Sequence, residues 1–570
     1  MIKYAFYRFM ILTSITLAFA AFSQHAEAKI PTSSLFPSLS EKDEATVEKY
    51  LEYRNAKGRL FSSPVKADPS NLWSQLDSLD DAIEGTSTAK AYANPKMPSS
   101  GKEIIVAVVD SGVDINHEDL KGKIWTNYAE LNGIQGVDDD GNGYVDDVHG
   151  WNFLGNRDGT NVDATTLEVT REYARLKKKS QKRRLSETEQ AYFIKVSAQF
   201  NEELKDAQDS LRYYQEMMSA INLLKKNGLK SETVEAVNQI QSNNREIEAA
   251  KQIALRIFGN PRIKNSEGLK AIIDDNTQKI QFCYNENFSS SQIVGDNPQN
   301  LDETGYGNND VSGPDASHGT HVAGIIAANR DNNLGILGQA DLVKIMSVRT
   351  VPNGDERDKD VANAIYYAVK NGAKIINMSF GKTFSPQKKA VDKAVLYAES
   401  KGVILVHASG NDGMSTEKGH NNFPLKKVRQ NTPLEREVTN WIEVGASSKL
   451  KGPKMAAYFS NYGKSTVDVF APGVSILSSI PGNGYAEFNG TSMATPQVAG
   501  VLALLMSRFP LYATSEIVEA VLENTTQYSD QLVNIPCKDM PCTGQISFSE
   551  LSRTGGIVNT NKALEALLLK

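Results

Sequence analysis

The sequence contains few cysteines: three among its 570 residues. So small a number excludes a fold held together by a dense disulfide framework, and none of the three stands in a C-x-x-C metal or redox pattern. Cys537 and Cys542 are close enough along the chain to form a small disulfide loop in an oxidising compartment. The alternative is two free thiols. Cys283 is left over, and we interpret it as a structural thiol.

The chain also lacks a large excess of charge of either sign. Its 62 basic and 68 acidic residues leave a formal charge of −6. Binding to a phosphate backbone requires a clear basic excess, so we expect no nucleic acid partner.

Long hydrophobic runs are missing except at the N-terminus. There the run Phe9 to Phe22 follows Lys3 and Arg8 and precedes Ala26-Glu27-Ala28. This pattern predicts a signal peptide over residues 1–28, and so a secreted or periplasmic protein. The alternative is a membrane anchor, but about 14 apolar residues fall short of the roughly 20 that a spanning helix needs. We therefore expect no stable membrane anchor.

Residues 29–70 are polar, and we interpret them as a propeptide or N-terminal extension. From Lys102 onward the pattern changes. Glu103 to Val109 is a continuous apolar, β-branched run, which is typical of a buried parallel strand. Similar runs alternate with helical patterns further along, at 342–348, 358–370, 374–378, 385–400, 403–408 and 441–444. This alternation predicts an α/β fold whose mostly parallel central sheet is covered on both faces.

One part of the chain departs from this alternation. Glycine and proline are absent from Thr160 to Asn227, which favours uninterrupted helix. Apolar residues recur there at spacings of three and four, at Leu204, Ala207, Leu211, Tyr214, Met218 and Ile221. Such a seam predicts a helical hairpin or a short coiled coil. We interpret residues 160–285 as a helical insertion.

Three short segments carry residues suited to nucleophilic catalysis. Asp110-Ser-Gly ends the first apolar run, His318-Gly-Thr-His-Val-Ala-Gly lies in the middle of the chain, and Gly490-Thr-Ser492-Met-Ala-Thr-Pro lies near its end. Cleaving a peptide at neutral pH requires a hydroxyl activated by a base, and a carboxylate that orients the base. Asp, His and Ser supply these groups.

These segments resemble the three signature motifs of the subtilases, the subtilisin-like serine peptidases, and they occur in the order found in subtilisin. The resemblance covers roughly 70–160 and 300–570. It implies a three-layer subtilisin-like fold over 71–570, interrupted by the insertion at 160–285. It also implies a secreted serine endopeptidase that cleaves protein or peptide substrates through an acyl-enzyme. Asp110 would orient the imidazole of His318, His318 would act as general base and acid, and Ser492 would be the nucleophile. A lipase is excluded because G-T-S-M-A is not G-x-S-x-G.

The resemblance implies the remaining parts of a subtilase site as well. Asn411 would be the oxyanion-hole residue, with the Ser492 N–H as second donor, although a turn residue beside a glycine is the alternative. The substrate-binding walls would be two short segments, Ser379, Phe380 and Gly381 on one side and Ala408, Ser409 and Gly410 on the other. The opposite substrate-binding edge should lie near Gly354 to Arg357. Asp355 and Glu356 there either favour basic side chains or belong to a solvated loop.

The sequence suggests two kinds of metal site, one for zinc and one for calcium. The pair His318 and His321 has a spacing that suits zinc, but no third ligand cluster follows, and we interpret His321 as structural. Calcium is better supported, because oxygen-bearing residues alternate in an acidic loop: Asp138, Asp140, Asn142, Tyr144 through its carbonyl, and Asp147. A plain acidic turn is the alternative. By resemblance, a second calcium site would join Asp119 to the loop Asn329 to Ile336.

A strongly basic run lies in the insertion: seven of the ten residues from Arg175 to Arg184 are basic. It is a solvated helix face, an exosite that attracts an acidic partner, or a processing site. This run motivates a rival hypothesis, in which the insertion makes the chain a binding or adhesion protein. The complete set of Asp, His, Ser and oxyanion residues favours a peptidase, either a degradative one or a narrowly specific maturation protease.

Overall fold

The computed structural model describes residues 59–61, 69–260, 263, 265–419, 421–429, 434–538 and 544–570. The predicted signal peptide and most of the expected extension at 29–70 lie outside these residues. Cys283 is buried and free. Cys537 is disulfide-bonded, and Cys542 lies outside the described residues.

A nine-stranded sheet forms the centre of the described structure, in the order β13-β16-β10-β9-β6-β5-β2-β4-β3. Every neighbouring pair is parallel except β13 and β16. The strands are β2 (Ile104–Asp110), β3 (Gly150–Asn152), β4 (Val343–Arg349), β5 (Ile375–Met378), β6 (Ile404–Ala408), β9 (Trp441–Ser447), β10 (Val469–Pro472), β13 (Thr526–Gln527) and β16 (Gly556–Ile557). The predicted α/β fold with a mostly parallel sheet is confirmed.

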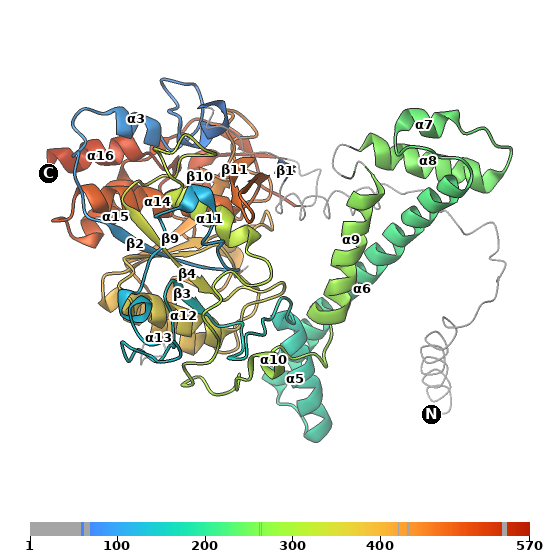
Figure 1. The fold of residues 1–570 in the computed structure, drawn as a ribbon, viewed down its shortest axis with the longest axis horizontal. Coiled ribbons are helices and arrows are strands. Elements are labelled where there is room, and N and C mark those ends of the chain that lie inside the picture. Colours follow the sequence, from blue (N-terminus) through green and yellow to red (C-terminus); the bar gives the residue numbers. More distant parts are fainter. Residues whose placement is uncertain are drawn as a thin grey trace. The chain divides into compact units, whose positions relative to one another are not determined.

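Helices cover both faces of this sheet, because side chains along a strand point to alternate faces. From β2, Val106 and Val108 pack in one core with α11 (Ser317–Ala327) and α14 (Thr491–Arg508). Ala107 and Val109 pack in a second core with α12 (Asp358–Lys370) and α13 (Lys388–Ser400). Figure 1 shows these helix pairs on opposite sides of the sheet. The remaining helices of this unit include α3 (Thr88–Ala93), α15 (Thr514–Glu523) and α16 (Thr560–Leu569).

Smaller elements surround the main sheet. β1 (Arg59–Phe61), from the expected N-terminal extension, pairs antiparallel with β12 (Gly484–Phe488), which also pairs with β11 (Ile476–Ile480). Two further hairpins are β7 (Lys427–Arg429) with β8 (Glu435–Glu437), and β14 (Leu532–Asn534) with β15 (Gln545–Ser547). Short helical turns are η2 (Pro69–Gln75), η3 (Glu118–Leu120), η5 (Thr416–Lys418) and η6 (Phe548–Glu550).

The region predicted to be a helical insertion is helical. It contains α5 (Glu168–Lys182), α6 (Glu187–Lys226), α7 (Val234–Gln239), α8 (Arg245–Gly259), α9 (Ser266–Gln278), η4 (Lys279–Cys283) and α10 (Ser291–Val294). The helical character therefore continues past residue 285. Residues 211–273 form a compact unit of their own, in which the end of α6 packs against α7 and α8 through Leu224, Val237 and Ala254. Three helices, rather than a two-stranded coiled coil, make up this small core.

Among the residues that the structure describes, no helix combines the length and the apolar character needed to cross a membrane. The longest of these helices, α6, carries charged residues throughout.

Candidate functional site

Asp110 and His318 form a hydrogen-bonded pair at the carboxyl end of β2, an inner strand of the central sheet. Asp110 is the last residue of β2, and His318 is the second residue of α11. The Asp110 Oδ1 and His318 Nδ1 atoms are 2.7 Å apart. The Asp110 side chain is 1% exposed and that of His318 is 34% exposed. A buried carboxylate at Nδ1 keeps the proton on that nitrogen, so Nε2 carries the lone pair of the neutral ring.

Ser492 is the second residue of α14, and two hydrogen bonds join it to Ser379 at the end of β5. The Ser492 hydroxyl donates to the Ser379 carbonyl at 3.1 Å, and the Ser379 hydroxyl donates to the Ser492 carbonyl at 2.9 Å. Asn377 in turn donates its side-chain N–H to the Ser379 hydroxyl at 2.9 Å.

Pro496 explains why the Ser492 carbonyl is available to Ser379. In a helix this carbonyl would accept the N–H four residues later, but that residue is Pro496, which has none. The predicted motif from Gly490 to Pro496 thus leaves one acceptor open, and the Ser379 hydroxyl takes it. The sequence pattern alone did not indicate this role for either residue.

The register of the sheet brings these groups to one edge. β2 and β5 are parallel neighbours in which Val109 pairs with Met378. Asp110 and Ser379 directly follow those two residues, so both lie at the carboxyl edge of adjacent strands. Ligands of open α/β sheets bind at this edge, where the strand order changes direction.

Asn411 lies in the loop after β6, and its side chain is held by Thr491. The Asn411 Oδ1 atom accepts the Thr491 backbone N–H at 2.9 Å and the Thr491 hydroxyl at 3.1 Å. Because Oδ1 faces Thr491, the amide Nδ2 remains as a donor toward Ser492. A methyl group built on Gly490 would lie 3.5 Å from the Ser492 nitrogen and 3.7 Å from Asn411 Nδ2. Two N–H donors therefore border one small space beside the Ser492 side chain.

The two predicted substrate-binding walls follow neighbouring strands. β5 and β6 are parallel with Met378 opposite His407, so Ser379, Phe380 and Gly381 lie beside Ala408, Ser409 and Gly410. Apart from Gly381, which is partly exposed, these residues are buried.

Two asparagines that the sequence reasoning missed hold these walls. Asn422 donates its side-chain N–H to the Ala408 carbonyl at 2.8 Å, and it leaves no room for a side chain at Gly381. Asn461 donates to the Ser409 carbonyl at 2.9 Å. Neither stands in a recognisable motif, and the carbonyl groups that they bind lie 14 and 52 residues away in the chain.

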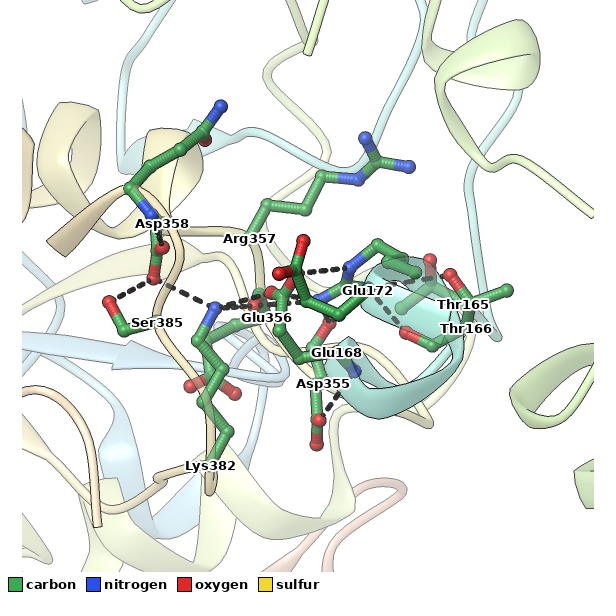
Figure 2. A network of polar contacts seen from close by, with 12 residues as sticks. Thr165, Thr166, Glu168, Glu172, Asp355, Glu356, Arg357, Asp358, Lys382 and Ser385 are labelled. Atoms are coloured by element: carbon green, nitrogen blue, oxygen red, sulfur yellow. Dashed lines mark hydrogen bonds and ion pairs between the residues drawn. The ribbon is translucent and has the colours of Figure 1, made fainter. Parts of the chain in front are cut away.

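The segment Gly354 to Arg357 is not a solvated loop, contrary to one of the two alternatives. Glu356 is 2% exposed. The Glu168 backbone N–H donates to Asp355 Oδ2 at 2.8 Å, and the Arg171 guanidinium donates to the backbone carbonyls of Asp355 and Glu356. Both acidic residues thus lie under the first turn of α5, as Figure 2 shows, and burial raises the pKa of Glu356.

Lys382 connects this segment to the substrate-binding wall that ends at Gly381. Its ammonium lies 2.8 Å from the Glu168 carboxylate and 2.9 Å from that of Asp358, and it donates to the Glu356 carbonyl at 2.7 Å. Burial alone would raise the pKa of Glu168, but Arg171 and Lys382 lower it to about 2. A buried ionic network therefore binds α5 to the segment Gly354 to Arg357 and to Lys382, the residue after the wall at Gly381.

His321 has the surroundings of a structural residue. Its Nε2 atom lies 3.0 Å from the carbonyl oxygens of both Ile476 and Ala486, and its ring stacks on Phe488. Burial lowers the pKa of His321 to about 3, so the ring is neutral near pH 7. These contacts agree with the structural interpretation.

The acidic loop brings several of its predicted calcium ligands together. Carboxylate oxygens of Asp140, Asp147 and Glu130 lie within 4.8 Å of one another. Glu130, in α4 (Tyr128–Leu131), was not predicted because it precedes the loop. Asp138 lies beside this group and accepts the backbone N–H groups of Asn142 and Gly143.

Of the other loop residues, Asn142 contacts the carboxylates and Tyr144 packs in the core. The Asn142 amide lies between Asp140 and Asp147 and donates to both at 3.1 Å. The Tyr144 ring packs in the core against Trp151 and Tyr367. Burial raises the pKa of Asp147 to about 6. The oxygen-rich donor set fits a hard cation such as Ca²⁺.

The second predicted calcium position also brings its partners together. Asp119 is buried; Oδ1 accepts the Asn332 side-chain N–H at 2.8 Å, and Oδ2 accepts the Ile336 backbone N–H at 3.1 Å. Both oxygens thus meet donors from the chain itself. A cation here would require the Asn332 amide to turn its oxygen inward.

The basic run of α5 is partly neutralised. Four of its residues form ion pairs, namely Arg175 with Glu172, Lys177 with Glu286, and both Lys179 and Arg183 with Glu189. Lys178, Lys182 and Arg184 are exposed. The net positive charge of this face is therefore smaller than the sequence indicates, and an exosite there stays a prediction.

Comparison with known proteins relates this site to a family. The profile of the subtilase family matches residues 101–537. The chain is 39% identical over 224 residues to alkaline elastase YaB of a Bacillus species, covering 38% of this chain and 53% of that protein. It is 44% identical over 193 residues to a thermophilic serine proteinase of Bacillus strain AK1, covering 34% of this chain and 43% of the other. The chain thus spans about half the length of the curated relatives it matches.

Among solved structures, proteases from Pseudoalteromonas arctica are similar, with 19% identity and a TM-score of 0.45 over 88% of this chain and 99% of that one. The family match covers well over half of the chain and contains Asp110, His318 and Ser492. This chain belongs to the subtilase family.

Proposed function

We propose that the chain is a serine endopeptidase in which Asp110, His318 and Ser492 form the catalytic triad. The observation that carries the proposal is the 2.7 Å bond between Asp110 and His318, at the sheet edge where Ser379 accepts the Ser492 hydroxyl. His318 Nε2 would take the proton of the Ser492 hydroxyl while its oxygen attacks the peptide carbonyl. The same proton then goes to the leaving amine, and water hydrolyses the acyl-enzyme.

The space beside Gly490 is suited to the oxyanion of this reaction. Asn411 Nδ2 and the Ser492 N–H border it, so both donors would face the negative charge that develops on the carbonyl oxygen. Thr491 acts as a positioning residue, because its bonds to Asn411 Oδ1 keep the amide nitrogen turned toward the reacting carbonyl.

Protein or peptide substrates would bind in extended form along the residues after β5. The wall of Ser379, Phe380 and Gly381 follows the last paired residue of that strand, so it offers backbone groups to an added strand. The second wall, Ala408 to Gly410, would flank the substrate side chain next to the scissile bond. The N-terminal signal pattern supports secretion or export to the periplasm.

Calcium is the proposed structural ion. Asp138, Asp140, Asn142, Asp147, Glu130 and the Tyr144 carbonyl would hold it in the acidic loop, with Asp119 and Asn332 as a second position. Bound there, the ion would neutralise a concentration of carboxylates, which otherwise repel one another.

Substitution of the nucleophile tests the catalytic proposal. In Ser492→Ala, hydrolysis of casein should fall by about 10⁴-fold or more, and labelling by a fluorophosphonate should disappear. Ser400→Ala, an exposed serine at the end of α13, is the matched control and should retain both. If Ser492→Ala still cleaves casein, the assignment of Ser492 as nucleophile is wrong. If the wild type neither cleaves casein nor is labelled, a binding or adhesion function becomes the better hypothesis.

A further inference from the structure

A cavity of about 520 Å³ lies beside α5, outside the proposed catalytic set. Residues from five segments line it: the start of α5, Glu286 to Ser289, Pro298 and Gln299, Arg357 and Asp358, and Pro386 and Gln387. Its volume is within the range of small-ligand pockets. Most of its lining residues are polar or charged, and Ala174, Phe288, Pro298 and Pro386 add apolar surface, so the cavity suits a ligand that carries a polar group on an apolar frame.

Three helices begin at this cavity. α5 starts at Glu168, α12 at Asp358, and α13 directly after Gln387. The first turn of a helix carries partial positive charge from its unpaired N–H groups. The starts of α5 and α13 already meet carboxylates, because the Glu168 N–H donates to Asp355 and the Gln387 N–H donates to Asp358, so an additional anion needs a partner of its own.

The acidic side chains of the lining are already neutralised. Each has a cationic partner within 3 Å: Glu168 with Arg171 and Lys382, Glu172 with Arg175, Glu286 with Lys177, and Asp358 with Lys382. These pairs also occupy the other two arginines of the lining.

Arg357 is the exception among the cations of the lining. Its guanidinium donates to the Ser290 hydroxyl at 3.2 Å, and among the described residues no carboxylate comes within ion-pair distance of it. Figure 2 shows the guanidinium directed away from the acidic residues of the network. A largely buried guanidinium without a carboxylate is costly, and it matches a carboxylate in a two-pronged geometry.

The position of Arg357 relates the cavity to the candidate cleft. Arg357 ends the segment Gly354 to Arg357, the expected substrate-binding edge, and Lys382 joins that segment to the wall at Gly381. We propose that the cavity is an accessory subsite that binds a carboxylate of the peptide substrate, with Arg357 as its partner. This inference rests on the proposed peptidase function and adds a preference for acidic peptides.

Binding to an inactive enzyme tests the subsite without depending on turnover. In Ser492→Ala, fluorescence anisotropy would compare labelled eight-residue peptides that carry Glu at successive positions with their Gln counterparts. At one position the Glu peptide should bind about 10-fold or more tightly, since only the Glu carboxylate can form a charge-assisted hydrogen bond with the guanidinium. Arg357→Gln in the same background should remove that difference, and Arg357→Lys should restore part of it.

Arg184→Gln is the matched control, because it removes the same charge from the exposed basic run just after α5. It should leave the ratio of the Glu and Gln affinities unchanged. The subsite is refuted if Glu and Gln peptides bind equally at every position, or if Arg184→Gln lowers the ratio as much as Arg357→Gln. Persistent hydrolysis by Ser492→Ala would instead refute the catalytic proposal, so the two failures are distinguishable.

Discussion

At the scale of single residues, the candidate site depends on a position that has no side chain. Gly490 precedes α14 with a φ of 156°, and a methyl group there would contact both proposed oxyanion donors. The absence of a Cβ keeps the space beside Ser492 open for the substrate carbonyl. Gly490 would therefore contribute to catalysis because it has no side chain to fill this space, and not through a contact of its own.

Gly490→Ala should reduce kcat for a peptide substrate by about 10²-fold, with a smaller effect on KM. The added methyl group displaces the oxyanion from its donors, and the loss of one such donor has an effect of this size. Steady-state kinetics would measure both constants. Gly452→Ala is the control, because Gly452 has a φ of 118° and no atom within 4 Å of its added methyl group. If both variants lose equal activity, backbone strain rather than the oxyanion space is responsible.

Single residues differ in how far the sequence predicts them. Asp110, His318 and Ser492 stand in short motifs whose chemistry can be read locally. The roles of Ser379 and Pro496 could not be predicted in this way, since they depend on a hydrogen bond between the end of β5 and the start of α14. Glu130 was missed for the same reason: it reaches the acidic loop from a preceding helix.

At the scale of elements, buried strands were the most predictable feature. The run Glu103 to Val109 corresponds to β2 (Ile104–Asp110), since continuous β-branched residues suit a strand covered on both faces. The short strand β3 and the β1–β12 pairing have no such pattern. The helicity of 160–285 was predicted, but the attachment of α5 to the cleft was not. That attachment depends on charged residues, whose burial follows from tertiary contacts and not from periodicity.

The network under α5 predicts a measurable coupling between this helix and the rest of the enzyme. Glu168→Gln leaves Lys382 and Arg171 buried with less negative charge, so the free energy of unfolding at pH 7 should fall by about 3 kcal/mol. KM for peptides should rise as well, because Lys382 adjoins the wall at Gly381. Urea unfolding and peptide kinetics would measure the two effects.

The pH dependence of this effect has a definite sign. Glu168 has a folded pKa of about 2, below its ordinary 4.5, so its stabilising effect is complete above pH 4.5. It is lost as the pH falls from 4.5 toward 2, and the difference between wild type and Glu168→Gln should shrink over that range. Glu435→Gln, which breaks an exposed pair with Arg429, should change stability little at any pH. A constant difference down to pH 2 would contradict the role of the Glu168 charge.

At the scale of the whole molecule, the proposed calcium site would connect ion binding to the stability of the central domain. The loop lies between β2 and β3, two strands of the nine-stranded sheet. The Tyr367 hydroxyl, from α12 on the sheet face, also donates to Asp147 at 2.5 Å. An ion bound among Asp140, Asp147 and Glu130 would thus be held by segments that come together only in the folded chain.

Removal of calcium should therefore lower the melting temperature of the whole domain. A ligand that binds only the folded state adds about 2.7 kcal/mol at a concentration 100 times its Kd. Differential scanning calorimetry with and without EGTA would measure the change. Glu130→Gln should reduce the EGTA effect, whereas Asp139→Asn should keep it, because Asp139 belongs to the same loop but lies outside the proposed ligand set. An EGTA-insensitive melting temperature, with no calcium found by elemental analysis of the purified protein, would refute the ion and leave an acidic turn held by the amides of Asn127 and Asn142.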